Sequence, residues 1–133
     1  MAVRPTTLKQ MDAAVKKTLV VGATDKPGRY ANLAAQSLLR HGHDIELLGL
    51  KKGTINGHSI QTGQPDLEGV DTVTMYVGPR NQPTLYDYIK RLKPRRVIFN
   101  PGAENPEFER ELQQEGIEPI EACTLVMLSI GTY

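Results

Sequence analysis

Short apolar runs alternate with longer amphipathic stretches along most of this chain. Five runs are rich in apolar residues, and they span 18–22, 43–50, 72–77, 96–100 and 117–122. The first is apolar almost throughout, which is typical of a strand covered on both faces of a sheet. Between the runs, apolar residues recur three and four positions apart, as on one face of a helix. The pattern therefore predicts strands that alternate with helices.

The expected helices are bounded by residues that favour helix ends. Asn105 can cap a helix N-terminus and Pro106 suits the first helical position, whereas Pro94 is expected to stop a helix. Glycine commonly follows the last helical residue, as Gly42 and Gly116 do here. Helices are expected at 30–41, 83–93, 106–115 and 124–130. Strands joined by such helices pair in parallel through right-handed crossovers. We therefore expect one doubly wound α/β domain of Rossmann type, with helices on both faces of a mainly parallel, five-stranded sheet.

Two shorter segments interrupt the alternation between the second and third strands. An Asn-Gly pair between apolar and β-branched residues favours a type I′ turn, so 54–60 is expected to form a minor hairpin. The segment 65–70 is expected to form a short helical turn before the third strand. Neither segment is assigned to the main sheet.

The N-terminal region has a helical pattern of its own. Residues 7–10 have the spacing of a capping box, and Leu8 and Met11 share a helical face with Val15. We expect a short helical extension that packs on the edge of the main fold. The expected organisation is therefore an extension over 1–17 and a domain over 18–133.

The stretch from Thr18 to Tyr30 is the one around which the predicted fold is organised. A strand ends in Gly22, a polar loop follows, and a helix begins directly afterwards. Glycine lets the backbone approach a ligand closely, and unpaired N–H groups at a helix start favour an anion. Lys26 and Arg29 add positive charge to the same loop. The loop matches neither G-x-G-x-x-G nor G-x-x-x-x-G-K-[ST], so an ordinary strand-to-helix connection remains the alternative.

Four predicted strands end in residues that are small, polar or able to open the backbone. Doubly wound sheets bind ligands outside the carboxyl ends of their strands, where the strand order reverses. The four ends are Gly22-Ala23-Thr24, Gly49-Leu50-Lys51, Gly78-Pro79-Arg80 and Asn100-Pro101-Gly102. Together they indicate a nucleotide-type ligand that lies across this edge of the sheet.

The loop after the second strand narrows the choice of nucleotide. An NAD site typically has an acidic residue there, which accepts a hydrogen bond from the ribose 2′-hydroxyl. This chain has Lys51 and Lys52 instead. An ammonium group suits a phosphate, so NADP with its 2′-phosphate and coenzyme A with its 3′-phosphate both fit. A solvated lysine pair in a surface loop is the alternative.

Composition excludes several other classes of protein. No apolar run approaches the roughly 20 residues of a membrane span, and the first 17 residues are too polar for a secretory signal. The formal net charge of +1 lacks the basic excess of a nucleic-acid-binding domain. A single cysteine, Cys123, allows no internal disulfide, and we interpret it as a packing residue at the end of the fifth strand. We expect a cytoplasmic protein with no nucleic-acid, membrane or metal partner and no recognisable catalytic residues.

Several segments together carry a resemblance to a known family. They are 20–27 with Arg29-Tyr30, 41–43, 49–53, 100–102 with 104–106, and 121–124. As a set, they resemble the small CoA-binding proteins, which are similar to the N-terminal domain of the succinyl-CoA synthetase α subunit and of NDP-forming acyl-CoA synthetases. The resemblance extends from about Thr18 to the C-terminus. It departs from the family at Gly49-Leu50, where many members have Asn-Pro.

The resemblance implies coenzyme A or an acyl-CoA as the ligand, and it implies a role for each loop. The residues implied for the CoA phosphates are Gly22, Ala23, Thr24, Lys26, Arg29 and Tyr30. Those implied for the ribose phosphate are Gly49, Lys51 and Lys52. Those implied as backbone of the pantetheine groove are Gly78, Pro79, Asn100, Pro101 and Gly102.

The expected function is therefore a single-domain CoA-binding module. Synthetase activity is not expected, because this chain lacks the further domains of the synthetases. An NADP-binding oxidoreductase or a nucleotide-sensing regulatory domain on the same fold is the alternative. A dehydrogenase needs a second substrate-binding region and an acid–base residue, and 133 residues leave little room for either.

Overall fold

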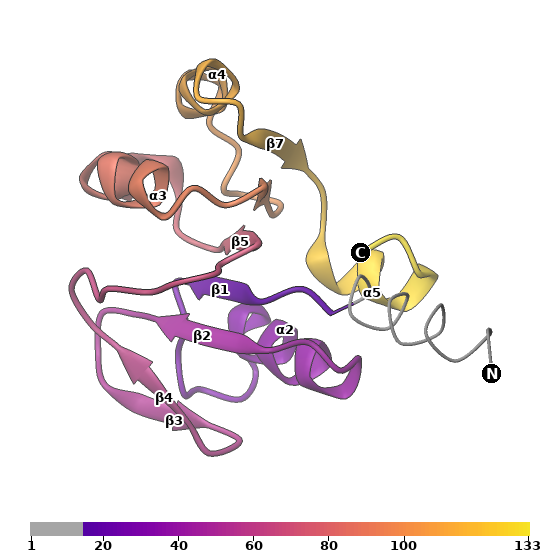
Figure 1. The fold of residues 1–133 in the computed structure, drawn as a ribbon. Coiled ribbons are helices and arrows are strands. Elements are labelled where there is room, and N and C mark those ends of the chain that lie inside the picture. The colour runs from indigo at the N-terminus through magenta and orange to yellow at the C-terminus, as the bar shows by residue number, and fades with distance from the viewer. Residues whose placement is uncertain (1–14) are drawn as a thin grey trace, which may run out of the picture.

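The computed structural model describes residues 15–133 and alternates strands with helices (Figure 1). The elements are β1 (Thr18–Val21), α2 (Tyr30–Arg40), β2 (Ile45–Leu48), β3 (Gly53–Ile55), β4 (His58–Gln61), β5 (Thr72–Met75), η1 (Pro79–Asn81), η2 (Pro83–Leu85), α3 (Tyr86–Leu92), β6 (Arg96–Phe99), α4 (Pro106–Gln114), β7 (Glu118–Glu121) and α5 (Thr124–Ile130), where η denotes a 3₁₀ turn. None of the helices in this range is long and apolar enough to cross a membrane. The extension expected over 1–17 lies almost wholly outside the described residues, so it and the domain boundary stay predictions.

One sheet runs through the molecule, in the strand order β3-β4-β2-β1-β5-β6-β7. All neighbouring strands are parallel except β3 and β4, which are antiparallel. From β1 the chain adds β2 on one side and then returns to place β5 on the other side. The strand order therefore reverses at β1. The predicted doubly wound α/β fold of Rossmann type is confirmed.

The sheet has seven strands, so the predicted number of five is wrong. The Asn-Gly hairpin forms as expected, with positive φ at both Asn56 (48°) and Gly57 (83°). It is part of the main sheet, because β4 pairs with β2 in the register Leu47↔Ile60. Ile60 is only 3% exposed. The burial of this side chain, which the local pattern does not reveal, holds the hairpin on the sheet edge.

Helices cover both faces of the sheet, as predicted, and each face has its own apolar core. The core on one face includes Tyr88 and Ile89 of α3 with Phe108 and Leu112 of α4. The core on the other face includes Ala31, Ala35 and Leu38 of α2 with Leu128 of α5. Figure 1 shows the two pairs of helices on either side of the strands.

The helical turn predicted for 65–70 is wrong, because this connection is irregular. Its carbonyl groups accept hydrogen bonds from side chains elsewhere in the chain. The Tyr88 hydroxyl donates to the Pro65 carbonyl at 2.6 Å, and Lys17 Nζ donates to the Glu68 carbonyl at 2.7 Å. These tertiary bonds replace the local ones that a helical turn makes.

Helix starts show one local cap and one tertiary cap. Asn105 caps α4 as predicted, because its Oδ1 accepts from the Phe108 N–H at 3.1 Å. At α5, Thr124 is the first helical residue, and Cys123 occupies the N-cap position without making a side-chain capping bond. The Thr124 N–H donates to Oδ1 of Asn100, at 2.9 Å. The cap of α5 therefore comes from the end of β6, 24 residues earlier.

Candidate functional site

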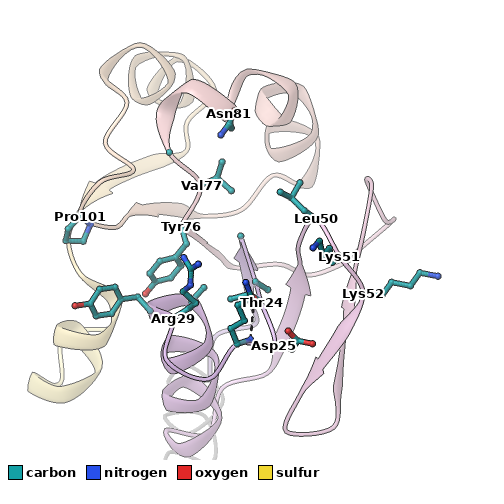
Figure 2. Close-up of a pocket in the computed structure, with 16 residues that line it drawn as sticks. Thr24, Asp25, Arg29, Leu50, Lys51, Lys52, Tyr76, Val77, Asn81 and Pro101 are labelled. Carbon is teal, nitrogen blue, oxygen red and sulfur yellow. Dashed lines mark hydrogen bonds between the residues drawn. The ribbon is translucent and has the colours of Figure 1, made fainter.

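A cavity of about 590 Å³ lies at the carboxyl ends of the strands, where the strand order reverses (Figure 2). It is lined by the loops that follow β1, β2, β5 and β6, together with the start of α2. Sheets of this topology bind ligands at this place, outside the carboxyl ends of the strands at the switch point, which is where the strand order reverses. The lining residues are Gly22, Ala23, Thr24, Asp25, Lys26, Arg29, Tyr30, Ala31, Leu50, Lys51, Lys52, Tyr76, Val77, Gly78, Asn81 and Pro101.

The loop after β1 is held in place by hydrogen bonds from both of its ends. The N–H groups of Gly22 and Ala23 both donate to the Leu48 carbonyl at 2.9 Å. At the other end, Asn32 Nδ2 donates to the Thr24 carbonyl, also at 2.9 Å. Asn32 is 3% exposed, so the loop is tied to the buried face of α2. Because the N–H groups of Gly22 and Ala23 are already used, neither is free to bind the phosphates expected of these residues.

Two glycines allow the loop after β2 to approach the loop after β1, and the end of β1 to approach the residues that follow β5. A Cβ on Gly49 would collide with the Ala23 carbonyl oxygen. Gly22 has a φ of 96°, and a Cβ there would lie 3.2 Å from Tyr76 and Val77. Glycine is therefore required at both positions by the path of the backbone. Gly49 lets the loops after β1 and β2 meet closely, although it does not line this cavity itself.

The start of α2 borders the cavity, and no side chain caps its first N–H groups. Its N-cap is Arg29, whose side chain makes no capping hydrogen bond, and the first turn holds no acidic residue. Tyr30 and Ala31, the first two helical residues, both line the cavity. A helix start without a capping side chain or a carboxylate favours an anion through its N–H groups and dipole.

Charged side chains on the cavity wall are mostly cationic. Lys26 and Arg29 come from the loop after β1, and Lys51 and Lys52 come from the loop after β2. Asp25 is the only carboxylate among the lining residues. None of these five makes an ion pair within residues 15–133. Figure 2 shows Lys52 extending away from the other labelled side chains.

Tyr76 forms part of the cavity wall and part of the core at once. Its ring packs against the apolar core that contains Ala31 and Ala35. The hydroxyl is buried and has no hydrogen-bond partner within the described part of the chain. Burial, with a smaller contribution from nearby Cys123, raises the pKa of Tyr76 above its usual range. Tyr76 is therefore a neutral, largely apolar contact surface.

The structure brings most of the predicted site residues together. Those that line the cavity are Gly22, Ala23, Thr24, Lys26, Arg29, Tyr30, Lys51, Lys52, Gly78 and Pro101. Gly49, Pro79, Asn100 and Gly102 do not line it. Pro79 begins the 3₁₀ turn η1 and is exposed outside the cavity, and the Gly102 N–H donates to Glu104 Oε1 at 2.8 Å.

Asn100 is a structural residue, with its side chain fully engaged in the fold. It is 1% exposed. Its Nδ2 donates to Thr74 Oγ1 at 2.7 Å and to the Met75 carbonyl at 2.9 Å. Its Oδ1 caps α5 through the Thr124 N–H. The amide thus ties together β5, β6 and α5, and no polar atom of it is left for a ligand.

Six lining residues were missed by reasoning from the sequence: Asp25, Ala31, Leu50, Tyr76, Val77 and Asn81. Asp25 and Leu50 lie inside loops that the sequence did single out. Tyr76 and Val77 were assigned to the third strand, which ends at Met75. The signal available was Gly78, which marks the end of the strand but not how many residues before it have left the sheet.

A second cavity of about 280 Å³ adjoins the first. The two share Gly22, Leu50 and Val77 as lining residues. Leu50 is 99% exposed, so a large apolar side chain stands at the junction of the two cavities. The remaining lining residues of the second cavity are Val21, Leu48, Gly49, Gly63, Gln64, Thr84 and Leu85.

The doubly wound sheet and the cationic cavity at its switch point define a Rossmann-type domain of the kind that binds nucleotides. Comparison with known families identifies which kind of nucleotide-binding domain this is. The chain belongs to the CoA binding domain family, whose model matches residues 16–129. None of the curated proteins matches this chain.

Solved structures with the same fold include chains matched over almost their whole length and a longer chain matched over a part of it. The crystal structure of an uncharacterized protein has 56% identity and a TM-score of 0.89, and the match covers 90% of this chain and 99% of that one. Cell-free ID.343 from Thermus thermophilus has 21% identity and a TM-score of 0.79, with 96% and 98% covered. A dinucleotide forming acetyl-coenzyme A synthetase 1 from Ca. Korarchaeum cryptofilum has 15% identity and a TM-score of 0.67; the match covers 80% of this chain and 25% of the synthetase. The last two matches show the fold.

Proposed function

We propose that this protein binds coenzyme A or an acyl-CoA in the cavity at the switch point, as a single-domain binding module. The observation that carries the proposal is that four cationic side chains line one cavity together with the uncapped start of α2. Such a site suits a ligand with several phosphate groups. Membership of the CoA binding domain family supports CoA among the ligands of this kind.

The pyrophosphate of the ligand is assigned to the loop after β1 and the start of α2. Thr24, Lys26, Arg29 and Tyr30 line this part of the cavity. Lys26 and Arg29 are exposed and free of ion pairs within the described residues, so they can turn toward an anion at little cost. Gly22 and Ala23 shape the floor of the site, because their N–H groups bind Leu48.

The adenosine end is assigned to the loop after β2 and the second cavity. Lys51 and Lys52 stand beside the junction, where they can bind a phosphate on the ribose. The exposed Leu50 and the walls of the smaller cavity supply apolar surface for the adenine ring. The pantetheine arm is assigned to the opposite side, toward Gly78 and Pro101.

Calorimetry with CoA and dephospho-CoA tests this assignment. A lysine–phosphate contact contributes about 1.5–3 kcal/mol, so dephospho-CoA should bind roughly 10- to 100-fold more weakly than CoA. The double variant Lys51→Ala/Lys52→Ala should remove most of this difference while leaving dephospho-CoA nearly unaffected. Raising the salt concentration should narrow the gap as well.

Two controls make the result interpretable. Arg40→Ala/Arg110→Ala loses the same charge from exposed positions outside the cavity, so it should bind CoA like the wild type. Equal affinities of the wild type for CoA and dephospho-CoA would show that Lys51 and Lys52 do not bind the 3′-phosphate. Tighter binding of NADPH than of CoA would instead favour the NADP-binding alternative.

A further inference from the structure

Asp25 is an unexpected residue in a cavity that otherwise attracts anions. It is the only carboxylate among the lining residues, beside two lysines of the neighbouring loop. It is exposed and makes no hydrogen bond or ion pair through its side chain within the part of the chain that the structure describes. A free carboxylate repels phosphate groups, so its presence weakens the site unless it recognises something else on the ligand.

The position of this carboxylate is set by the backbone around it. The preceding residue, Thr24, is tied to α2 by Asn32, and its Oγ1 accepts a hydrogen bond from the Lys26 N–H at 3.3 Å. The side chain of Asp25 lies flat against Gly53, where an added Cβ would stand 2.9 Å from Oδ2 and 3.2 Å from the Cβ of Asp25. Gly53 directly follows Lys51 and Lys52 in the chain. The carboxylate therefore lies at the base of the lysine loop, as Figure 2 shows.

Gly53 has an ordinary backbone conformation, because its φ is not positive. The backbone would therefore accept alanine there. What glycine provides is room, because any side chain would push the Asp25 carboxylate out of its place. The contact between Asp25 and Gly53 thus joins the loop after β1 to the loop after β2, at the assigned ribose end of the site.

We propose that Asp25 selects the position of the phosphate on the ribose, by accepting a hydrogen bond from the free 2′-hydroxyl and repelling a 2′-phosphate. This inference rests on the proposed CoA site. A hydroxyl can donate to a carboxylate in a strong, charge-assisted bond, whereas a phosphate in the same place brings a like charge. The lysines attract a ribose phosphate at either position, so the carboxylate supplies the discrimination that they lack.

The test is calorimetry with CoA and with its isomer that carries the ribose phosphate at the 2′ position. We expect the wild type to prefer CoA by at least tenfold. Asp25→Asn should reduce this preference at least fivefold, mainly by tightening the binding of the 2′ isomer. Asp25→Ala should reduce it as well and should also weaken CoA severalfold, because no acceptor is left for the 2′-hydroxyl.

Two further variants separate position from charge. Gly53→Ala keeps Asp25 but displaces its carboxylate, so it should lower the preference for CoA. Asp44→Asn removes an exposed carboxylate at the opposite edge of the sheet, before β2, and should leave the preference unchanged. Thermal unfolding of each variant shows that the comparison is made on folded protein.

The outcomes distinguish this inference from the proposed function. An unchanged preference in both Asp25→Asn and Asp25→Ala would overturn the role of Asp25. So would equal binding of both isomers by the wild type, although the CoA site itself would then stand. Absence of binding of either isomer to the wild type would refute the proposed function, and the inference with it.

Discussion

Replacing Asn100 with alanine tests whether this residue serves the fold or the ligand. In the wild type its side chain makes hydrogen bonds to Thr74, Met75 and Thr124. In the variant, Thr74 Oγ1 still has Thr124 Oγ1 as a partner at 2.8 Å, and the Met75 carbonyl still accepts from the residue 100 N–H at 3.3 Å. The N–H of Thr124, a residue with 0% exposure, loses its cap.

These contacts set the size of the expected effect. One buried N–H left unpaired costs about 1–3 kcal/mol, and the two other lost bonds add about 1 kcal/mol together because their partners remain satisfied. We therefore expect Asn100→Ala to lower the free energy of unfolding by about 2–4 kcal/mol, a large share of the roughly 5–15 kcal/mol of a typical domain. With a urea m-value of about 2 kcal/mol/M, the midpoint should fall by roughly 1–2 M.

The assay is urea denaturation of Asn100→Ala beside Asn81→Ala. Asn81 is exposed, lines the cavity and makes no side-chain hydrogen bond within residues 15–133, so its removal should change stability by less than about 0.5 kcal/mol. Folded Asn100→Ala should keep the ligand affinity of the wild type. A loss of less than about 1 kcal/mol, or one equal to that of Asn81→Ala, would refute the reasoning.

Two other perturbations follow from the same structure. Gly49→Ala should lower the free energy of unfolding by about 1–3 kcal/mol, because the added Cβ meets the Ala23 carbonyl. Gly28→Ala adds its Cβ in open space, so its free energy of unfolding should stay within about 1 kcal/mol of the wild type. Similar denaturation midpoints for the two variants would contradict this. Burial and then the charge of Lys16 lower the pKa of His43, whose Nδ1 accepts from the Lys16 N–H. As the pH is lowered through about 6.5, the unfolded state therefore binds more protons than the native state. The stability of the fold consequently decreases as the pH is lowered. His43→Asn should flatten this fall between pH 7 and pH 5, and an unchanged slope would exclude His43 as its source.

Local interactions account for the features that could be predicted from the sequence. Asn105 caps α4 because its partner lies only three residues away. The Asn-Gly turn forms because both residues accept positive φ. The loops of the site could be identified for a related reason, since each follows directly from a strand end. Features set by contacts between distant segments were missed, as the tertiary cap of α5 by Asn100 and the irregular segment held by Tyr88 illustrate.

The sequence by itself determined the class of fold, the order of its elements and the loops at the strand ends, because apolar spacing and helix-end residues act over a few positions. Only the tertiary structure decided which of those residues share a cavity and which hold the fold. It placed Asn100 in the core, joined the hairpin to the sheet and laid Asp25 against Gly53. Packing between segments that are far apart in the chain makes these choices, and no local pattern records it.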